Sequence, residues 1–163
     1  MRIIRLMLPF GDAYRKSIAK SMLPTRRQNA YLNASSSKTH GVNFAIVGST
    51  TLPVEFLANK GVIALVTNSS LTKQLKWMHT HLNATSHNSK DCFEKHRKSL
   101  FMVGEIGGND YNYAFFQGKS INDLKSMVPD FVKATKDAIT LQFPDFITGI
   151  FCYAMVLQLQ GGA

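Results

Sequence analysis

Several features that mark specialised classes of protein are scarce or missing in this sequence. Its two cysteines, Cys92 and Cys152, allow one disulfide at most and do not identify the redox compartment. Nothing in the composition indicates collagen, a coiled coil or wholesale disorder. The chain also has no internal repeat, which excludes a repeat architecture.

Long apolar runs are missing as well. The uncharged stretch Phe146–Leu159 is shorter than the about 20 residues that a membrane-spanning helix needs. We therefore expect a buried helix or strand there, and no membrane span. The apolar run that follows Met1 is interrupted by Arg5 and stopped by Pro9, so it predicts no export signal.

The residues that are present suit one globular domain with an unevenly charged surface. Of 163 residues, 45% are apolar, and the phenylalanines and tyrosines would supply most large core side chains. The formal net charge of +9 belongs mainly to residues 1–40, whereas the remainder is nearly neutral. A basic segment can bind nucleic acid or an anionic membrane surface, but a solvated terminus is the commoner case. We expect no nucleic-acid partner.

Three asparagines begin glycosylation sequons, namely Asn33, Asn68 and Asn83. Such sites are used only on a secretory route, so they favour a secreted glycoprotein. Chance recurrence in a chain rich in asparagine and serine is the alternative.

Alternating strand and helix patterns predict an α/β fold with a mostly parallel sheet. Apolar runs at 42–47 and 99–103 are typical of buried strands. Residues 69–82 predict a helix, because apolar residues recur at helical spacing. A second helix is predicted from Ser120, with a kink or break at Pro129.

A glycine-rich loop, predicted for residues 105–110, follows the strand at 99–103. In α/β sheets, sites form in loops beyond the carboxyl ends of the strands. The pair Gly107-Gly108 lets the backbone approach a ligand, and Asn109 offers an amide donor of the kind that stabilises an oxyanion. An ordinary turn built from the same residue types is the alternative.

Two longer stretches carry a family resemblance. Residues 104–113 (GEIGGNDYNY), with 114–118 after them, are very similar to the third motif block of plant GDSL esterases. Residues 41–50 (GVNFAIVGST) resemble the second block of that family. Shorter similarities occur at 74–77, 98–101 and 124–139, so the resemblance covers about residues 28–140.

The resemblance implies an SGNH-type α/β/α sandwich, incomplete in this chain, and hydrolysis of carboxylic esters through an acyl-enzyme. It assigns the backbone N–H of Gly48 and the side-chain amide of Asn109 to the oxyanion hole. It implies a small-molecule or lipid ester as substrate, with no cofactor and no metal. We expect Gly48 and Asn109 to lie close together at the ends of neighbouring strands.

The sequence departs from the family pattern at the nucleophile and the base. Phe10-Gly11-Asp12-Ala13 echoes the family's Phe-Gly-Asp-Ser block but lacks its serine, and it lies too close to the second block. Leu8-Pro9-Phe10-Gly11 equally resembles a Leu-Pro-Tyr-Gly stretch found between the family's first two blocks, and on either reading no serine occupies the nucleophile site. No histidine follows His96. We therefore expect no esterase activity from this chain, with a non-catalytic ester- or lipid-binding homologue as the alternative. His79, His81 and His87 could be imagined as metal ligands, but solvated helix histidines are favoured.

These observations divide the chain into three parts. Residues 1–40 are expected to be a basic, irregular leader, 41–140 the middle of a GDSL/SGNH domain, and 141–163 a divergent apolar tail. Because the strands at 42–47 and 99–103 would lack neighbours, we also expect low stability.

Overall fold

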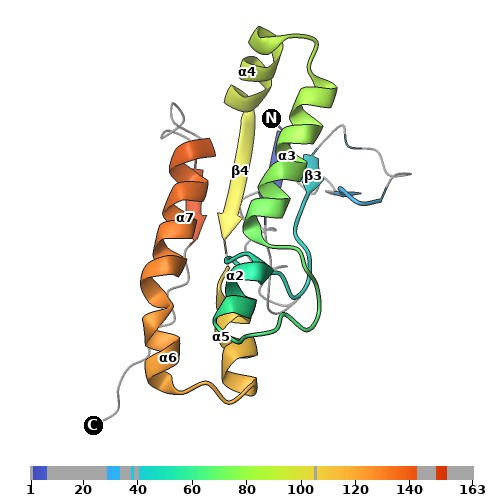
Figure 1. Ribbon diagram of the computed structural model, residues 1–163. Coiled ribbons are helices and arrows are strands. Elements are labelled where there is room, and N and C mark those ends of the chain that lie inside the picture. The colour runs from blue at the N-terminus through green and yellow to red at the C-terminus, as the bar shows by residue number, and fades with distance from the viewer. Residues whose placement is uncertain are drawn as a thin grey trace.

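A computed structural model describes residues 2–6, 29–33, 38, 41–104, 106–142 and 150–153. Strand β4 (Ser99–Gly104) runs between helices α7 (Val128–Gln142) and α3 (Leu71–Thr85), as Figure 1 shows. Helix α4 (Ser89–Arg97) precedes β4, and α5 (Gly108–Phe116) follows its carboxyl end. Two short helices, α2 (Val54–Asn59) and α6 (Ile121–Ser126), complete the helical set among the described residues.

The strands form a five-stranded sheet in the order β2-β3-β1-β4-β5. The other strands are β1 (Arg2–Leu6), β2 (Asn29–Ala30), β3 (Gly41–Asn43) and β5 (Ile150–Tyr153). Each neighbouring pair is parallel, and Ile4 of β1 lies opposite both Val42 and Phe101. The carboxyl ends of the strands therefore lie at one edge of the sheet. The predicted α/β class is confirmed.

We expected the basic segment 1–40 to be irregular, but parts of it form strands. Its residues 2–6 form β1, which lies between β3 and β4 in the sheet, and residues 29–30 form β2. Arg2 and Arg5 interrupt the apolar pattern of β1, so the sequence does not predict this strand. It is recognised only by its pairing with β3 and β4 in the structure. The Phe10–Ala13 string lies outside the described residues.

The tail contributes to the sheet as well. Residues 150–153 form β5, which pairs with β4. Strand β4 thus has a neighbour on either side, contrary to the premise on which we expected low stability. Within the part of the chain that the structure describes, no helix combines the length and apolarity needed to cross a bilayer.

The helix predictions hold with two adjustments. The helix expected at 69–82 is α3, and the helix expected from Ser120 breaks as predicted, since α6 ends at Ser126 and α7 begins at Val128. Pro129 lies in the first turn of α7, where its missing N–H costs no hydrogen bond. The loop expected at 105–110 is shorter, because α5 begins at Gly108 and takes Asn109 into its first turn.

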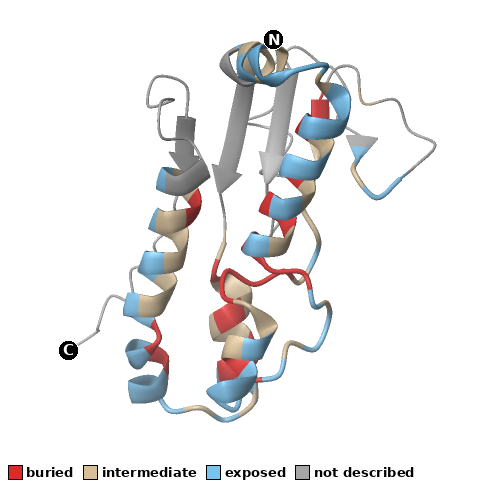
Figure 2. Cartoon of the chain, turned by 45° about the horizontal axis from the view of Figure 1, so that its top comes forward, coloured by how far each residue is buried: buried red, intermediate tan, exposed pale blue. Residues whose placement is uncertain are grey.

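Two apolar clusters make up the described core. One packs α3 beneath β3, and its buried residues are Val42, Phe44, Leu71, Leu75, Met78, Leu82 and Ala138. The other surrounds α5, with Leu52, Leu57, Val62, Tyr113, Ala114, Leu124 and Met127. Figure 2 shows buried residues along the inner faces of these helices and in the loop between them.

Candidate functional site

The loop after β3 makes a turn that requires glycine. Gly48 has φ +78°, in the left-handed region that side chains rarely adopt. A Cβ there would also lie 2.6 Å from the Val66 Cβ and 2.9 Å from the Tyr113 hydroxyl. Backbone conformation and close packing therefore both exclude a side chain at position 48.

A second required glycine directs the chain from β4 into α5. Gly107 is the N-cap of α5 with φ +106°, and a Cβ there would meet the Phe131 ring at 2.0 Å. Gly108, by contrast, has open space where a Cβ would be. The tight turn at Gly107 brings the first residues of α5 against the Gly48 loop.

Asn109 contacts that loop directly. Its Nδ2 donates a hydrogen bond to the carbonyl oxygen of Ser49 at 2.8 Å, which leaves the second amide hydrogen available. The expected closeness of Gly48 and Asn109 is therefore confirmed. The two do not come from neighbouring strands, however, because β1 lies between β3 and β4.

Asp110 has a role that the sequence did not indicate. Its carboxylate is fully buried, with Oδ2 accepting the Thr51 N–H at 2.8 Å and Oδ1 accepting the Leu52 N–H at 2.9 Å. Burial raises the pKa of Asp110 to about 6, and these backbone hydrogen bonds oppose that shift. The sequence marks Asp110 only as an acid that follows the Gly107-Gly108-Asn109 string, and its burial, which requires such hydrogen bonds, is seen only in the structure.

Tyr113 and Gln117 extend the same polar face of α5. The Tyr113 hydroxyl donates to the Gly48 carbonyl oxygen at 2.8 Å, and Gln117 exchanges hydrogen bonds with the Ile63 backbone at 2.9 and 2.8 Å. Burial raises the pKa of Tyr113, with a smaller contribution from the Asp110 charge. Because Asn109, Tyr113 and Gln117 are four residues apart, they lie on one side of the helix.

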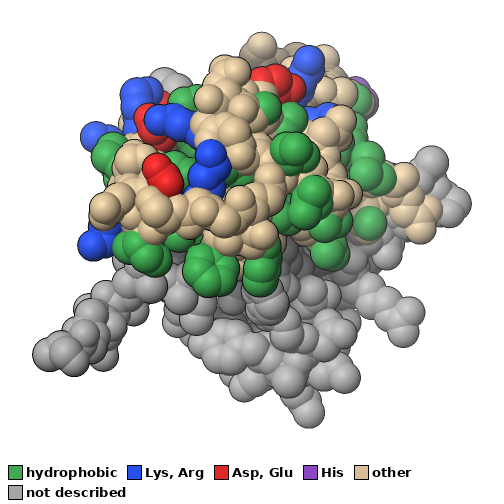
Figure 3. Space-filling model, turned by 60° about the horizontal axis from the view of Figure 1, so that its bottom comes forward, with side chains coloured by type: hydrophobic (Ala, Val, Ile, Leu, Met, Phe, Trp, Pro, Cys, Tyr) green, Lys and Arg blue, Asp and Glu red, His purple; other side chains and the backbone are tan. Residues whose placement is uncertain are grey.

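Apolar side chains surround this polar contact on the solvent side. Val47 is 81% exposed, next to Gly48 in the chain, and Val66 is 64% exposed although its Cβ lies beside Gly48. Ile63 and Leu65 are exposed on the same loop as Val66. Figure 3 looks onto the end of the molecule where α5 and α6 lie and shows apolar side chains at its surface.

The described histidine side chains lie away from this contact. His81 is half-buried against the rings of Tyr31 and Phe44, with centroids 6.1 and 6.0 Å away, so it is not a solvated residue. His79 and His87 are exposed, whereas His40 and the His96 side chain are outside the described part. Among the described residues, no group of three or more His, Cys, Asp or Glu could hold a metal ion.

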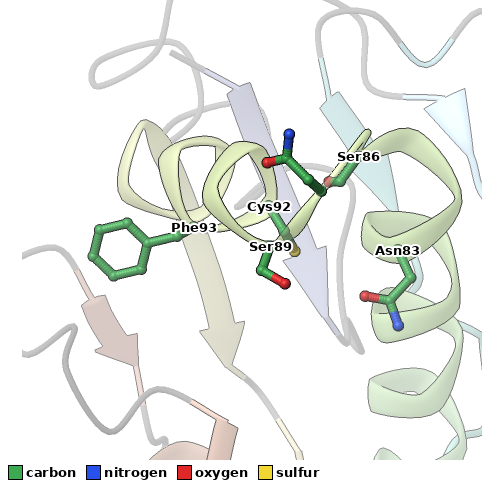
Figure 4. A pocket seen from close by; sticks show the side chains of 6 residues that line it. Asn83, Ser86, Ser89, Cys92 and Phe93 are labelled. Carbon is green, nitrogen blue, oxygen red and sulfur yellow. The ribbon is translucent and has the colours of Figure 1, made fainter.

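A pocket at the turn between α3 and α4 is separate from this site. Figure 4 shows its lining, which consists of Asn83, Ser86, Asn88, Ser89, Cys92 and Phe93. It lies at the α4 end of the molecule, whereas Gly48 and Asn109 lie by α5 (Figure 1). The amides and hydroxyls of this lining form no recognisable catalytic or ligand-binding arrangement. A disulfide between Cys92 and Cys152 is not tested, because the Cys152 side chain is outside the described residues.

Comparison with known proteins finds esterases. The chain is 49% identical over 100 residues to a GDSL esterase/lipase of Arabidopsis thaliana, a match that covers 61% of this chain and 26% of that protein. Acetylajmalan esterase 1 of Rauvolfia serpentina is 41% identical over 110 residues, 68% of this chain and 29% of its own length. Sinapine esterase of Brassica napus is 46% identical over 100 residues, which cover 61% of this chain and 26% of that protein.

The chain thus spans between about a quarter and a third of the length of these relatives. No model of a protein family matches the sequence, and no solved structure matches it significantly.

Proposed function

Over its aligned region this chain belongs to the plant GDSL esterase/lipase family, and from that premise we propose that Gly48 and Asn109 form the oxyanion-binding half of an ester-hydrolase site. The observation that carries the proposal is the 2.8 Å hydrogen bond from Asn109 to Ser49, next to Gly48. Asn109 thus contacts the residue next to Gly48, although Ser49 and Asn109 are 60 positions apart in the chain.

Two N–H groups would supply the chemistry of this half-site. The Gly48 N–H has no acceptor among the residues that the structure describes, and the Asn109 amide uses one of its hydrogens on Ser49. Donors held in place before the reaction stabilise the negative charge that develops on an ester oxygen, because they need no reorganisation. The Ser49 bond fixes the Asn109 amide in this way.

The same premise supports an SGNH-type α/β/α sandwich as the architecture. The parallel sheet, with a glycine-rich turn at the carboxyl end of β4, agrees with that arrangement. Within it, we propose residues 41–140 as the middle of the hydrolase domain, between the basic segment 1–40 and the tail 141–163.

Hydrolysis would need two further groups, an activated nucleophile and a base within hydrogen-bond reach. This sequence contains no Phe-Gly-Asp-Ser string, and no histidine follows Asn109. We propose that the chain by itself binds small-molecule or lipid esters without hydrolysing them.

The test uses the full chain and a stable mimic of the tetrahedral intermediate, a short alkyl phosphonate monoester. We expect saturable chemical-shift changes at the Gly48 amide and the Asn109 side-chain amide in 15N NMR spectra. Asn109→Ala should weaken binding at least about tenfold, since it removes one donor to a charged oxygen. Lys76→Ala, on the exposed side of α3, is the matched control.

Two outcomes would contradict the proposal. Shift changes confined to residues away from Gly48 and Asn109 would refute the oxyanion assignment. Turnover of a nitrophenyl ester, with labelling of one serine by a fluorophosphonate, would refute the proposed lack of hydrolysis.

The exposed apolar residues beside Gly48 favour binding of the apolar part of an ester. Val47, Leu65 and Val66 offer surface that water does not solvate well. Affinity for the phosphonate should therefore rise with alkyl chain length, by up to about 0.8 kcal/mol for each methylene group buried. An affinity independent of chain length would remove this part of the proposal.

We also propose glycosylation on a secretory route. Asn33, Asn68 and Asn83 are all exposed, as an acceptor asparagine must be. Expression with an added secretion signal in eukaryotic cells should yield a product whose gel mobility increases after treatment with an N-glycosidase. Unchanged mobility would contradict the assignment.

A further inference from the structure

The polar side of α5 holds consecutive backbone groups of one loop. Asp110 accepts the N–H groups of Thr51 and Leu52 at 2.8 and 2.9 Å, one on each carboxylate oxygen. Asn109 and Tyr113 donate to the carbonyl oxygens of Ser49 and Gly48, each at 2.8 Å. These three side chains lie within two turns of α5, and together they contact the backbone of residues 48–52.

These contacts constrain successive peptide planes. A peptide unit is planar, so a hydrogen bond to its oxygen or its N–H orients the whole unit. The Gly48 and Ser49 oxygens orient the units that follow these two residues, and the Thr51 and Leu52 N–H groups orient the next two. The Gly48 N–H belongs to the unit immediately before this constrained run.

We propose that Asp110 is a positioning residue, whose buried carboxylate sets the direction of the Gly48 N–H by holding the segment 48–52 against α5. The role rests on the proposed function, since it gives Gly48 its use as an oxyanion donor. Asp110 would not touch the ester; it would act through the loop. This assigns to Asp110 a part in the site that lies beyond the two oxyanion donors.

A carboxylate suits this role better than an amide does. Both of its oxygens accept hydrogen bonds, whereas an asparagine would turn an NH₂ group toward one of the two N–H donors. The Asp110 carboxylate is fully buried and pairs with no lysine, arginine or histidine among the described residues. Burial, and to a smaller extent the Asp110 charge, raises the pKa of Tyr111 and Tyr113, both of which stay neutral below pH 8.

The experiment is a pH titration of the full chain, followed by 15N NMR between about pH 4 and 8. Because the pKa of Asp110 is raised to about 6, the Thr51 and Leu52 amide shifts should change with a common midpoint near that pH. A positioning role requires the Gly48 amide to follow the same midpoint. The Leu75 amide in α3 is the internal control and should show no such step. A Gly48 amide that stays constant while Thr51 and Leu52 titrate would overturn the proposal.

Asp110→Asn gives a second readout. We expect the step near pH 6 to vanish at Gly48, and hydrogen exchange at Thr51 or Leu52 to accelerate at least about tenfold. If this variant does not fold, the wild-type titration decides alone. Phosphonate binding separates the two proposals: no binding with an intact Gly48 titration refutes the function, whereas binding with a constant Gly48 amide refutes the positioning role.

Discussion

Helices α3 and α5 use opposite means to hold the chain together. The buried face of α3 consists mainly of aliphatic residues, Leu71, Leu75, Met78 and Leu82. The contact side of α5 is polar, with Asn109, Asp110, Tyr113 and Gln117 bonded to backbone groups of two loops. Apolar burial is non-directional, whereas a hydrogen bond fixes direction as well as distance.

The difference separates stability from geometry. Mutations in the α3 cluster are expected to lower the free energy of unfolding of the whole domain. Mutations on the polar side of α5 are expected to displace the Gly48 loop, at a smaller cost in stability. The predictions below test this division, beginning with the turn that brings α5 into place.

Gly107→Ala should have the largest effect. The left-handed backbone costs a residue with a Cβ about 1–3 kcal/mol, and displacing the Phe131 ring adds about 1–3 kcal/mol. Chemical denaturation should therefore show that the free energy of unfolding falls by about 2–6 kcal/mol, the sum of the two costs. NMR spectra should show shift changes at the Gly48 amide. Gly108→Ala is the matched control, because a Cβ there meets nothing within 4 Å. Equal losses in the two variants would contradict the packing at Gly107.

Met78→Ala should lower the free energy of unfolding by about 2–5 kcal/mol, because Met78 is fully buried in the α3 cluster. If α3 contributes stability and not site geometry, the variant should keep the Gly48 amide shift while folded. Urea denaturation measures the first effect and NMR the second. Lys76→Ala, on the exposed side of the same helix, should leave both unchanged.

The pH dependence of stability should reveal Asp110. Its pKa is about 6 in the folded chain and about 3.9 when unfolded, so the folded state binds the proton more tightly. The stability from this group is therefore complete below about pH 4 and is lost as pH rises through 6, up to about 3 kcal/mol. Denaturation midpoints of wild type and Asp110→Asn, compared from pH 4 to 7, measure it. Parallel pH profiles in the two proteins would contradict this assignment.

Tyr113→Phe should have the smallest effect on stability, about 0.5–1.5 kcal/mol, because the ring stays and only the hydroxyl's hydrogen bonds, with the Gly48 oxygen and the Val66 backbone, are lost. Hydrogen exchange at residues 46–50 should accelerate more than exchange in α3. Tyr111→Phe is the control, since the Tyr111 hydroxyl makes no hydrogen bond to the residues that the structure describes. Both variants keep the aromatic ring, so a change in Tyr111→Phe as large as that in Tyr113→Phe would contradict the role assigned to the Tyr113 hydroxyl.

Much of the local structure was predictable from the sequence. The apolar spacing of Leu71, Leu75 and Met78 predicted α3, because that helix is recognised by its own period. Ser120 and Asp123 predicted the start of α6, where the capping box is present. The glycines and Asn109 pointed to the candidate site through their resemblance to the family's motif blocks, and the closeness of Asn109 to Gly48 followed.

Other features were settled only by the tertiary structure. Strand β1 has no apolar periodicity, and its place between β3 and β4 comes from backbone pairing with segments distant in the chain. Asp110 is an ordinary helix N-terminal acid in the sequence, and it becomes a buried ligand of the Thr51 and Leu52 N–H groups only when α5 meets the loop. Local patterns encode local hydrogen bonds and apolar faces, whereas partners almost sixty residues apart leave no period in the sequence to be read.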